Sequence, residues 1–257
     1  MALMQLIFLK RALPKECRGW LRATWNSILE FEQFYAERRF YRQFIKKGDL
    51  VFDIGANTGT KTRAFLSLGA RVVAVEPNPV CAGLIRQHYE VALAHQRLYV
   101  QECAVASERG KLMLRVFGER GAMTTGSGKF ERALEAAGNR STSTIQSETT
   151  TADDLVARFG LPVLIKIDVE GMDVEVLRGL HHRPRFTSFE FNTTEQLWEI
   201  TLLCFSEAAR LGFTQGNFSA SGTPKFILNR WCDLGSLPVE ITRWAMGRQT
   251  YGDVVLR

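Results

Sequence analysis

The feature of the sequence that most constrains its fold is the alternation of short apolar runs with helix-like segments. The runs "LVFDIG" (50–55), "RVVAVEP" (71–77) and "LPVLIKIDVEG" (161–171) have the length and the valine and isoleucine content of buried strands, and each is followed by a segment of helical periodicity. Strands and helices at this spacing form βαβ units with right-handed crossovers. The sequence therefore predicts a doubly wound α/β domain with a mostly parallel sheet.

The chain divides into a short N-terminal extension and one larger domain. A chain of 257 residues with 46% hydrophobic content can bury one sizeable core. In residues 1–47, aromatic and aliphatic residues recur at three- and four-residue intervals, which indicates one or two amphipathic helices. The alternating pattern begins after them. We therefore expect a helical extension over 1–47 and the α/β domain over 48–257.

Residues 118–150 interrupt the alternation. The segment is rich in glycine, serine and threonine and contains one helical candidate, "KFERALEAAG" (129–138). Polar segments of this length in a compact domain are usually functional loops, lids or disordered excursions. A substrate-side lid and a plain surface insertion are both open. Further on, "KFILNRW" (225–231) and "GDVVLR" (252–257) predict two closing strands, interpreted as an antiparallel hairpin at the sheet edge.

Net charge, cysteine content and the N-terminal segment indicate which partners and which cellular compartment to expect. The net charge of +6 favours anionic partners, but it bears on association and not on fold. The five cysteines form no C-x-x-C pair, which is typical of reduced thiols in an intracellular protein and not of a disulfide framework or a zinc site. The apolar start of the chain lacks a cleavage site and is too short to span a bilayer. We expect a cytoplasmic protein without a transmembrane segment, and a weak contact with a membrane surface stays an alternative.

The carboxyl ends of the predicted strands form the candidate site, because ligands of open parallel sheets bind there. The first strand delivers a small group of residues for this purpose: Asp53, Gly55, Ala56, Asn57 and Gly59. Glycines let backbone amides approach a ligand where a Cβ would collide, and the following helix N-terminus favours negative charge. The pattern suits a carboxylate or a phosphate, although a plain tight turn would also explain it.

An acid at the end of the second strand indicates a nucleoside. Glu76 follows Asp53 at close to the ~20-residue spacing at which nucleotide-binding folds place the acid that binds ribose hydroxyls, and Pro77 then turns the chain away. Asp53 stands before the glycines, where it suits the ammonium of an amino-acid moiety better than it suits phosphates. S-adenosylmethionine carries both the ammonium and the ribose. The sequence therefore predicts S-adenosylmethionine as the cofactor.

The run "LIKIDVEG" supplies the third part of the candidate site. In a buried strand, Lys166 and Asp168 point to one face. Burying them is costly unless they pair or meet a ligand, so a structural ion pair and a role toward the methyl donor or acceptor are both open. Asp168 and Glu170 are expected where the strand leaves the sheet. Asp168, Glu170 and Asp173 are oxygen ligands of the kind that magnesium takes, but Asp173 is expected in the following helix, so metal dependence stays a weaker alternative and no metal site is predicted.

These residues resemble a known family. The motifs "VFDIGANTG", "VVAVEPNP", "CAVAS", "TADDL", "IKIDVEG", "EVLRG" and "FTSFEFN" follow the pattern of FkbM-type S-adenosylmethionine-dependent methyltransferases over about residues 48–195. The resemblance implies the class I methyltransferase (Rossmann-like) sandwich, a seven-stranded sheet flanked by helices. It implies donor contacts from Asp53, Gly55 and Gly59 (methionine part), Glu76 (ribose) and Cys103 and Ala104 (adenine), with Asp168, Glu170 and Glu190 around methyl transfer. It further implies methylation of hydroxyl oxygens, often on sugars or natural products.

The predicted reaction is therefore methylation of a hydroxyl on a small molecule, which requires a base for the acceptor's proton. Asp168 is the first candidate and Glu190 the second, and Lys166 qualifies only if burial lowers its pKa. Two alternatives stay open. One is an NAD(P)-dependent oxidoreductase, which the missing third glycine of its fingerprint disfavours. The other is a non-catalytic nucleic-acid or protein binding module, for which no RNA-binding motif is found, so a nucleic-acid partner is not expected.

Overall fold

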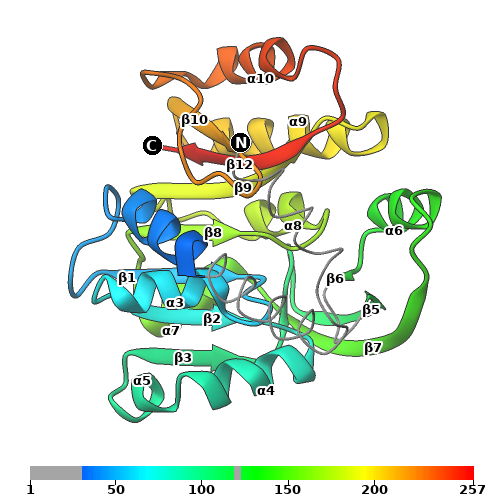
Figure 1. The fold of residues 1–257 in the computed structure, drawn as a ribbon. Coiled ribbons are helices and arrows are strands. Elements are labelled where there is room, and N and C mark those ends of the chain that lie inside the picture. The colour runs from blue at the N-terminus through cyan, green and yellow to red at the C-terminus, as the bar shows by residue number, and fades with distance from the viewer. Residues whose placement is uncertain (1–30, 119–122) are drawn as a thin grey trace, which may run out of the picture.

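The computed structural model describes residues 31–118 and 123–257, and its centre is an eight-stranded sheet (Figure 1). The strand order is β11-β10-β12-β9-β8-β1-β2-β3. In chain order the strands are β1 (Leu50–Ile54), β2 (Arg71–Val75), β3 (Leu98–Gln101), β8 (Leu164–Ile167), β9 (Phe186–Asn192), β10 (Gln215–Ala220), β11 (Cys232–Asp233) and β12 (Tyr251–Leu256). The strands from β3 to β9 pair in parallel, whereas β12 runs antiparallel to both of its neighbours. The predicted α/β class is confirmed, but the sheet has eight strands where seven were expected.

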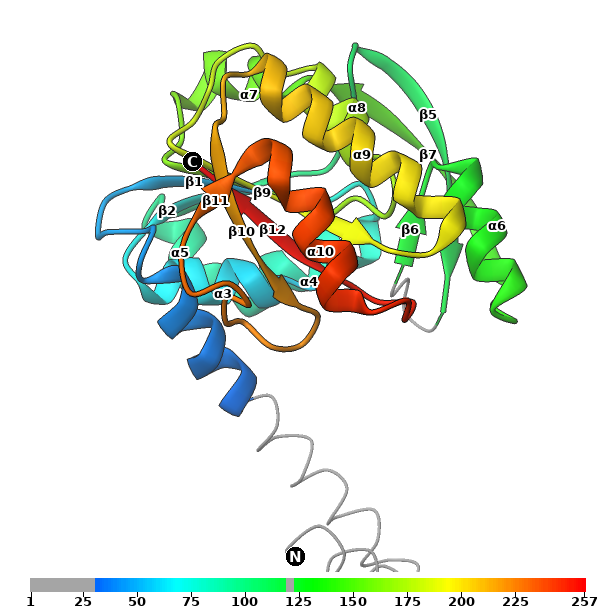
Figure 2. The ribbon, with the colours of Figure 1, turned by 90° about the horizontal axis from the view of Figure 1, so that it is seen from above.

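Helices cover both faces of this sheet (Figure 2). One face carries α7 (Ala152–Phe159), α8 (Asp173–Arg178), α9 (Glu195–Arg210) and α10 (Leu237–Ala245), which begins after a short 3₁₀ turn (Leu234–Ser236). The other carries the helix of residues 31–41, α3 (Thr60–Ser67), α4 (Pro79–His88) and α5 (Glu90–Ala94). Successive residues of a strand point to opposite faces of the sheet. Phe52 packs against the helices of the first face and Val51 against those of the second. Burial on both faces explains why the strands are near-continuous apolar runs.

A second sheet stands beside the carboxyl ends of the first. It has the order β4-β7-β5-β6, with β4 (Ala104–Val105), β5 (Gly110–Phe117), β6 (Met123–Thr125) and β7 (Ser141–Thr150). Between β6 and β7 lies α6 (Gly128–Ala136), where the sequence predicts a helix. The polar segment 118–150 thus contains regular structure over much of its length. Its strand β7 is polar because most of its residues are exposed or half-buried, while β5 supplies the apolar partners Leu114 and Val116.

The predicted C-terminal hairpin is wrong in one of its two strands. Strand β12 forms as expected, but residues 225–231 are not a strand and make only one isolated bridge, from Phe226 to Ser219. The partner of β12 is β10, in which the buried Asn217 accepts a hydrogen bond from the backbone N–H of Leu228 and donates to that residue's carbonyl oxygen. Strand β12 is also an interior strand and not an edge, because it lies between β10 and β9.

The apolar run 225–231 instead helps to hold the N-terminal helix. The ring of Phe226 packs edge to face against Trp231, Phe40 and Phe44. Residues 31–41 are helical, as predicted for this part of the extension, and residues 1–30 of the extension lie outside the described part of the chain. Among the described residues, none of the helices combines the length and the apolar character that a membrane crossing needs.

Candidate functional site

The candidate site is a pocket at the carboxyl ends of β1, β2 and β8. Strand β1 connects onward to β2 on one side and pairs with β8 on the other, so the strand order reverses here and leaves a crevice of the kind in which α/β proteins bind ligands. The pocket is lined by the ends of these three strands, by residues 103–105 and by the second sheet. Seven of the predicted cofactor residues line it: Gly55, Asn57, Glu76, Pro77, Cys103, Ala104 and Asp168.

The glycine turn is required by the chain's own packing. Gly55 has a φ of +81°, and a Cβ at this position would lie 1.8 Å from the backbone oxygen of Asp168. Gly59 has a φ of +86°, and its Cβ would meet the ring of Tyr89 at 2.7 Å. Only glycine fits both conditions. The turn therefore brings the end of β1 against the end of β8 and opens the pocket mouth between them.

Glu76 ties the end of β2 to this turn. The backbone N–H of Asn57 donates to Oε2 of Glu76 at 2.8 Å, and the N–H of Asn78 donates to Oε1 at 2.9 Å. Asn78 in turn caps α4 by accepting from the N–H of Val80. Burial raises the pKa of Glu76, and the two donated hydrogen bonds oppose that rise. The carboxylate is thus fixed in the pocket wall with lone pairs left for a ligand.

Three predicted cofactor residues lie behind the pocket and not in its lining. Asp53 is buried beneath the turn, where its carboxylate accepts from the hydroxyl of Thr62 at 2.5 Å, and burial raises its pKa to about 6. Ala56 is buried in the apolar layer under α3, and Gly59 begins that helix. Their observed contacts hold the turn and the first helix in place.

Lys166 and Asp168 form the ion pair that the sequence left open as one interpretation. The fully buried Nζ of Lys166 lies 3.2 Å from Oδ2 of Asp168 and 3.0 Å from Oδ1 of Asp253 on β12, and it donates to the carbonyl of Ile167. Burial lowers the pKa of Lys166, but the two carboxylates outweigh burial and raise it well above its usual range. A lysine that acts as a base needs a pKa that is lowered, so that it is uncharged near neutral pH. Lys166 therefore stays charged and holds Asp168 at the pocket rim.

Four carboxylates gather beyond this rim: Asp168, Glu170, Asp173 and Glu190. Burial, followed by the charges of Asp168 and Asp173, raises the pKa of Glu170 to about 8. Burial and the charge of Asp168 also raise the pKa of Asp173 to about 6 and move that of Glu190 well above its usual range. In residues 31–118 and 123–257, no three His, Cys, Asp or Glu side chains are placed so that they could hold a metal ion.

A second, smaller pocket adjoins these acids. It is lined by Phe130, Gly171, Asp173, Glu190, Asn192, Leu197, Ile200 and Thr201. Glu190 borders this pocket and not the larger one, which Asp168 and Glu170 line. Asp173 was expected only as a helix residue, and Asp253 was not singled out. The sequence feature that could have identified Asp253 is the presence of an acid within the apolar run "GDVVLR".

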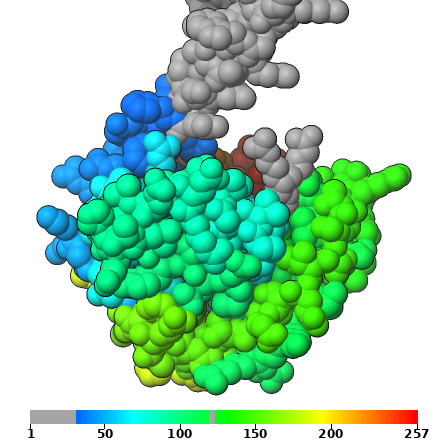
Figure 3. Space-filling view, turned by 90° about the horizontal axis from the view of Figure 1, so that it is seen from below, coloured from blue at the N-terminus to red at the C-terminus, as the bar shows by residue number. Residues whose placement is uncertain are grey.

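The second sheet closes the larger pocket on the remaining side. Leu112, Leu114, Thr124 and Gly126 line it. The side-chain amide of Asn78 donates to the hydroxyl of Thr124, and the hydroxyl of Thr125 donates to the carbonyl of Glu170 at 2.7 Å. Figure 3 shows the teal and cyan surface of α4, α5 and β3 adjoining the green surface of the second sheet. Segment 118–150 therefore contributes directly to the pocket wall, which its polar composition did not reveal.

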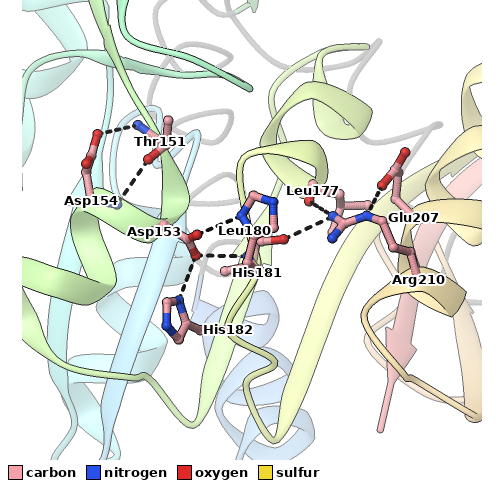
Figure 4. Close-up of polar contacts among 9 residues, drawn as sticks. All are labelled: Thr151, Asp153, Asp154, Leu177, Leu180, His181, His182, Glu207 and Arg210. Atoms are coloured by element: carbon pink, nitrogen blue, oxygen red, sulfur yellow. Dashed lines mark hydrogen bonds and ion pairs between the residues drawn. The ribbon is translucent and has the colours of Figure 1, made fainter.

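The motif "TADDL" has a structural role away from the pocket (Figure 4). Thr151 and Asp154 form a capping box at the start of α7. The carboxylate of Asp153 accepts from the backbone N–H of His181 at 2.9 Å and contacts the Nδ1 atoms of His181 and His182 at 2.8 and 3.0 Å. The two histidines are mostly exposed, and their contacts with Asp153 hold the segment after α8.

Comparison with protein-family models gives a match of substantial length. A family model described as "Methyltransferase FkbM domain" matches residues 53–213, which is more than half of the chain. A search of curated proteins found no match. S-adenosylmethionine is the methyl donor of the matched family, so this finding bears out the predicted cofactor.

Several solved structures also resemble the chain. Precorrin-6y C5,15-methyltransferase from Geobacter metallireducens GS-15 is 12% identical, with a TM-score of 0.42, over 89% of this chain and 86% of its own. A TehB-like SAM-dependent methyltransferase from Corynebacterium glutamicum is 11% identical, with a TM-score of 0.44, over 86% of each chain. Aeropyrum pernix fibrillarin, solved with bound S-adenosyl-L-methionine, is 8% identical, with a TM-score of 0.42, over 82% of this chain and 67% of its own. Identities and scores this low carry no inference about the activity of this chain.

Proposed function

This chain belongs to the FkbM family of S-adenosylmethionine-dependent methyltransferases, and we propose that it methylates a hydroxyl oxygen of a small molecule. The supporting observation is the position of Asp168. Its carboxylate lines the larger pocket, is 37% exposed, and is held from behind by the permanently charged Lys166. Family membership favours this function over the nicotinamide-dependent and non-catalytic alternatives.

The larger pocket has the features that the donor requires. Glu76 presents a fixed, buried carboxylate at the end of β2, suited to accept hydrogen bonds from ribose hydroxyls. Gly55 and Asn57 would border the methionine part, and Cys103 and Ala104 the adenine, next to the apolar side chain of Leu112. When bound, S-adenosylmethionine supplies a methyl group that its sulfonium already activates for transfer.

Asp168 is the residue that we assign to proton removal from the acceptor. A base within hydrogen-bond reach of the acceptor hydroxyl assists its attack, and holding the reacting atoms about 3 to 3.5 Å apart supplies much of the acceleration. Lys166 fixes the position of this carboxylate through the ion pair. Glu170 is a weaker candidate, because a pKa of about 8 leaves it largely protonated at neutral pH. Lys166 serves as a positioning residue and not as the base.

The proposal is tested by calorimetric titration with S-adenosylmethionine and S-adenosylhomocysteine, together with methyl transfer to a panel of hydroxylated small molecules. Asp168→Asn should keep donor affinity within a few-fold of wild type and lower turnover by about 100-fold or more. Glu76→Gln should weaken donor binding. Asp233→Asn, an exposed acid on β11, is the matched control and should change neither.

Two outcomes would count against the proposal. Failure of the intact protein to bind either nucleoside would remove the methyl-transfer function. Loss of donor binding in Asp168→Asn, with no separate loss of turnover, would make Asp168 a donor ligand instead of a base.

A further inference from the structure

The second pocket contains a buried carboxylate oxygen without a partner. Asp173 is 3% exposed and lines this pocket, and its Oδ1 atom makes no hydrogen bond. Leaving a buried charged oxygen unsatisfied costs several times the net value of an ordinary hydrogen bond. Such a group in a pocket wall indicates a ligand that donates to it.

The charge balance around this pocket calls for a cation. Asp168 and Glu170 approach it from the end of β8, Asp173 from α8 and Glu190 from β9. Among the described residues, Lys166 is the cation whose charge acts on both Asp173 and Glu190, and Asp253 on β12 already shares it. The four carboxylates therefore repel one another, and the raised pKa values of Glu170, Asp173 and Glu190 reflect that repulsion together with burial.

The remaining lining determines which kind of cation fits. Phe130, Leu197 and Ile200 supply the apolar part of the lining. The hydroxyl of Thr201 and the carbonyl of Asn192 are already hydrogen-bonded to each other. No described group of acids has the arrangement of a metal site. An apolar wall with an aromatic ring beside buried carboxylates is instead suited to an organic ammonium, whose carbon skeleton contacts the wall while its N–H groups donate.

We propose that the second pocket binds a protonated amine of the methyl acceptor, so that the acceptor is a hydroxylated amine of the amino-alcohol or amino-sugar class. The inference rests on the proposed function, because it places the acceptor's hydroxyl toward Asp168 and its ammonium toward Asp173 and Glu190. Gly171 lines the second pocket with a φ of +88°, and a Cβ there would lie 3.0 Å from Phe130 and 3.1 Å from Ser127, which is a tight contact. Glu190 is then an acceptor-binding residue and not a second base.

The proposal predicts a specific coupling between binding and protons. Glu170, whose pKa is raised to about 8, is largely protonated at neutral pH in the free protein, and an incoming ammonium favours its ionised form and that of Glu190, whose pKa is also raised. Binding should therefore release a proton. A neutral ligand of the same shape gains nothing from the carboxylates and should release none.

The test is calorimetric titration of the full-length protein, saturated with S-adenosylhomocysteine, with 2-aminoethanol and with ethylene glycol as the matched neutral probe. Titrations in two buffers of different ionisation enthalpy give the number of protons released. 2-Aminoethanol should bind with proton release and ethylene glycol should not. Asp173→Asn and Glu190→Gln should each weaken 2-aminoethanol roughly tenfold or more, while Asp233→Asn should leave it unchanged.

The outcomes separate this inference from the proposed function. If S-adenosylhomocysteine binds but 2-aminoethanol does not, or if ethylene glycol binds equally well, the ammonium site is overturned and the methyl-transfer function stands. If 2-aminoethanol binds and both variants retain its affinity, the amine lies elsewhere and the inference fails. If the nucleoside does not bind, the proposed function falls, and titration of the free protein with 2-aminoethanol still decides the site.

Discussion

Asp173→Asn is expected to stabilise the protein, and to do so more strongly at high pH. Asp173 is buried with one oxygen unpartnered, beside Asp168. Burial and this neighbouring charge raise its pKa from 3.8 to about 6. Between these two values the folded state binds more protons than the unfolded state, so the free energy of unfolding falls as pH rises through the window. Below this pH window Asp173 does not change the free energy of unfolding, and above it the full destabilisation by its buried charge is present.

The size of the effect follows from the pKa shift. A shift of about two units corresponds to roughly 3 kcal/mol of destabilisation when the carboxylate is fully ionised, and about half of that is already present at pH 5. Asparagine has nearly the same shape and carries no charge, so it removes this penalty. The advantage of the variant should grow by about 1.4 kcal/mol between pH 5 and pH 8. For a chain of this length, each 1 kcal/mol corresponds to roughly 2–4 °C in Tm.

Urea unfolding of wild type and Asp173→Asn at pH 5, 6.5 and 8, followed by circular dichroism, measures this difference directly. Asp233→Asn serves as the control for the loss of one surface charge. A difference between variant and wild type that stays constant across the three pH values would refute the assignment of the pKa shift to Asp173. A variant less stable than wild type at pH 8 would show that the backbone hydrogen bonds to the Asp173 carboxylate outweigh the penalty of burying its charge.

Three further predictions follow from packing and charge. Gly55→Ala places a Cβ 1.8 Å from the Asp168 carbonyl and should destabilise by about 3 kcal/mol or more in urea unfolding, whereas Gly48→Ala, where φ is +89° but the space is open, should show only the roughly 1–2 kcal/mol of left-handed backbone strain. Lys166→Met removes the ammonium that fixes the Asp168 carboxylate, so turnover should fall by up to about 100-fold while donor affinity changes little; unchanged turnover would show that Lys166 does not position the base. Asp153→Asn weakens exposed contacts to two histidines and should cost less than about 1 kcal/mol with donor affinity unchanged, so a change in that affinity would give the motif a role at the pocket.

The sequence predicts those parts of the site that depend on local patterns. The strand runs, the glycine turn and Glu76 could be placed because strand ends in a parallel sheet meet at one edge. The Lys166–Asp168 pair could be anticipated because a buried lysine needs a partner. Asp253 could not, because it lies nearly a hundred residues further along the chain and reaches Lys166 only through the antiparallel placement of β12.

The second sheet was missed for a different physical reason. Strand β7 is a run of serine, threonine and charged residues whose order depends on pairing with β5 and not on burial of its own side chains. Likewise, the apolar run 225–231 satisfies the periodicity of a strand but packs its aromatic rings against the N-terminal helix. Hydrophobic pattern reports which residues are buried, and it does not distinguish a strand from an irregular segment that buries the same side chains.

The excess of carboxylates connects stability to acceptor recognition. The same charge that destabilises the free protein at pH 8 is the one that an ammonium would neutralise, so evolution toward stability alone would remove Asp173. A ligand that binds only the folded state adds stability in proportion to its concentration relative to its Kd. Saturating 2-aminoethanol should therefore raise the Tm of wild type more than that of Asp173→Asn, and the stability gap between the two proteins should narrow at pH 8. An equal rise in both would mean that the destabilising charge and the ligand do not meet in the same pocket.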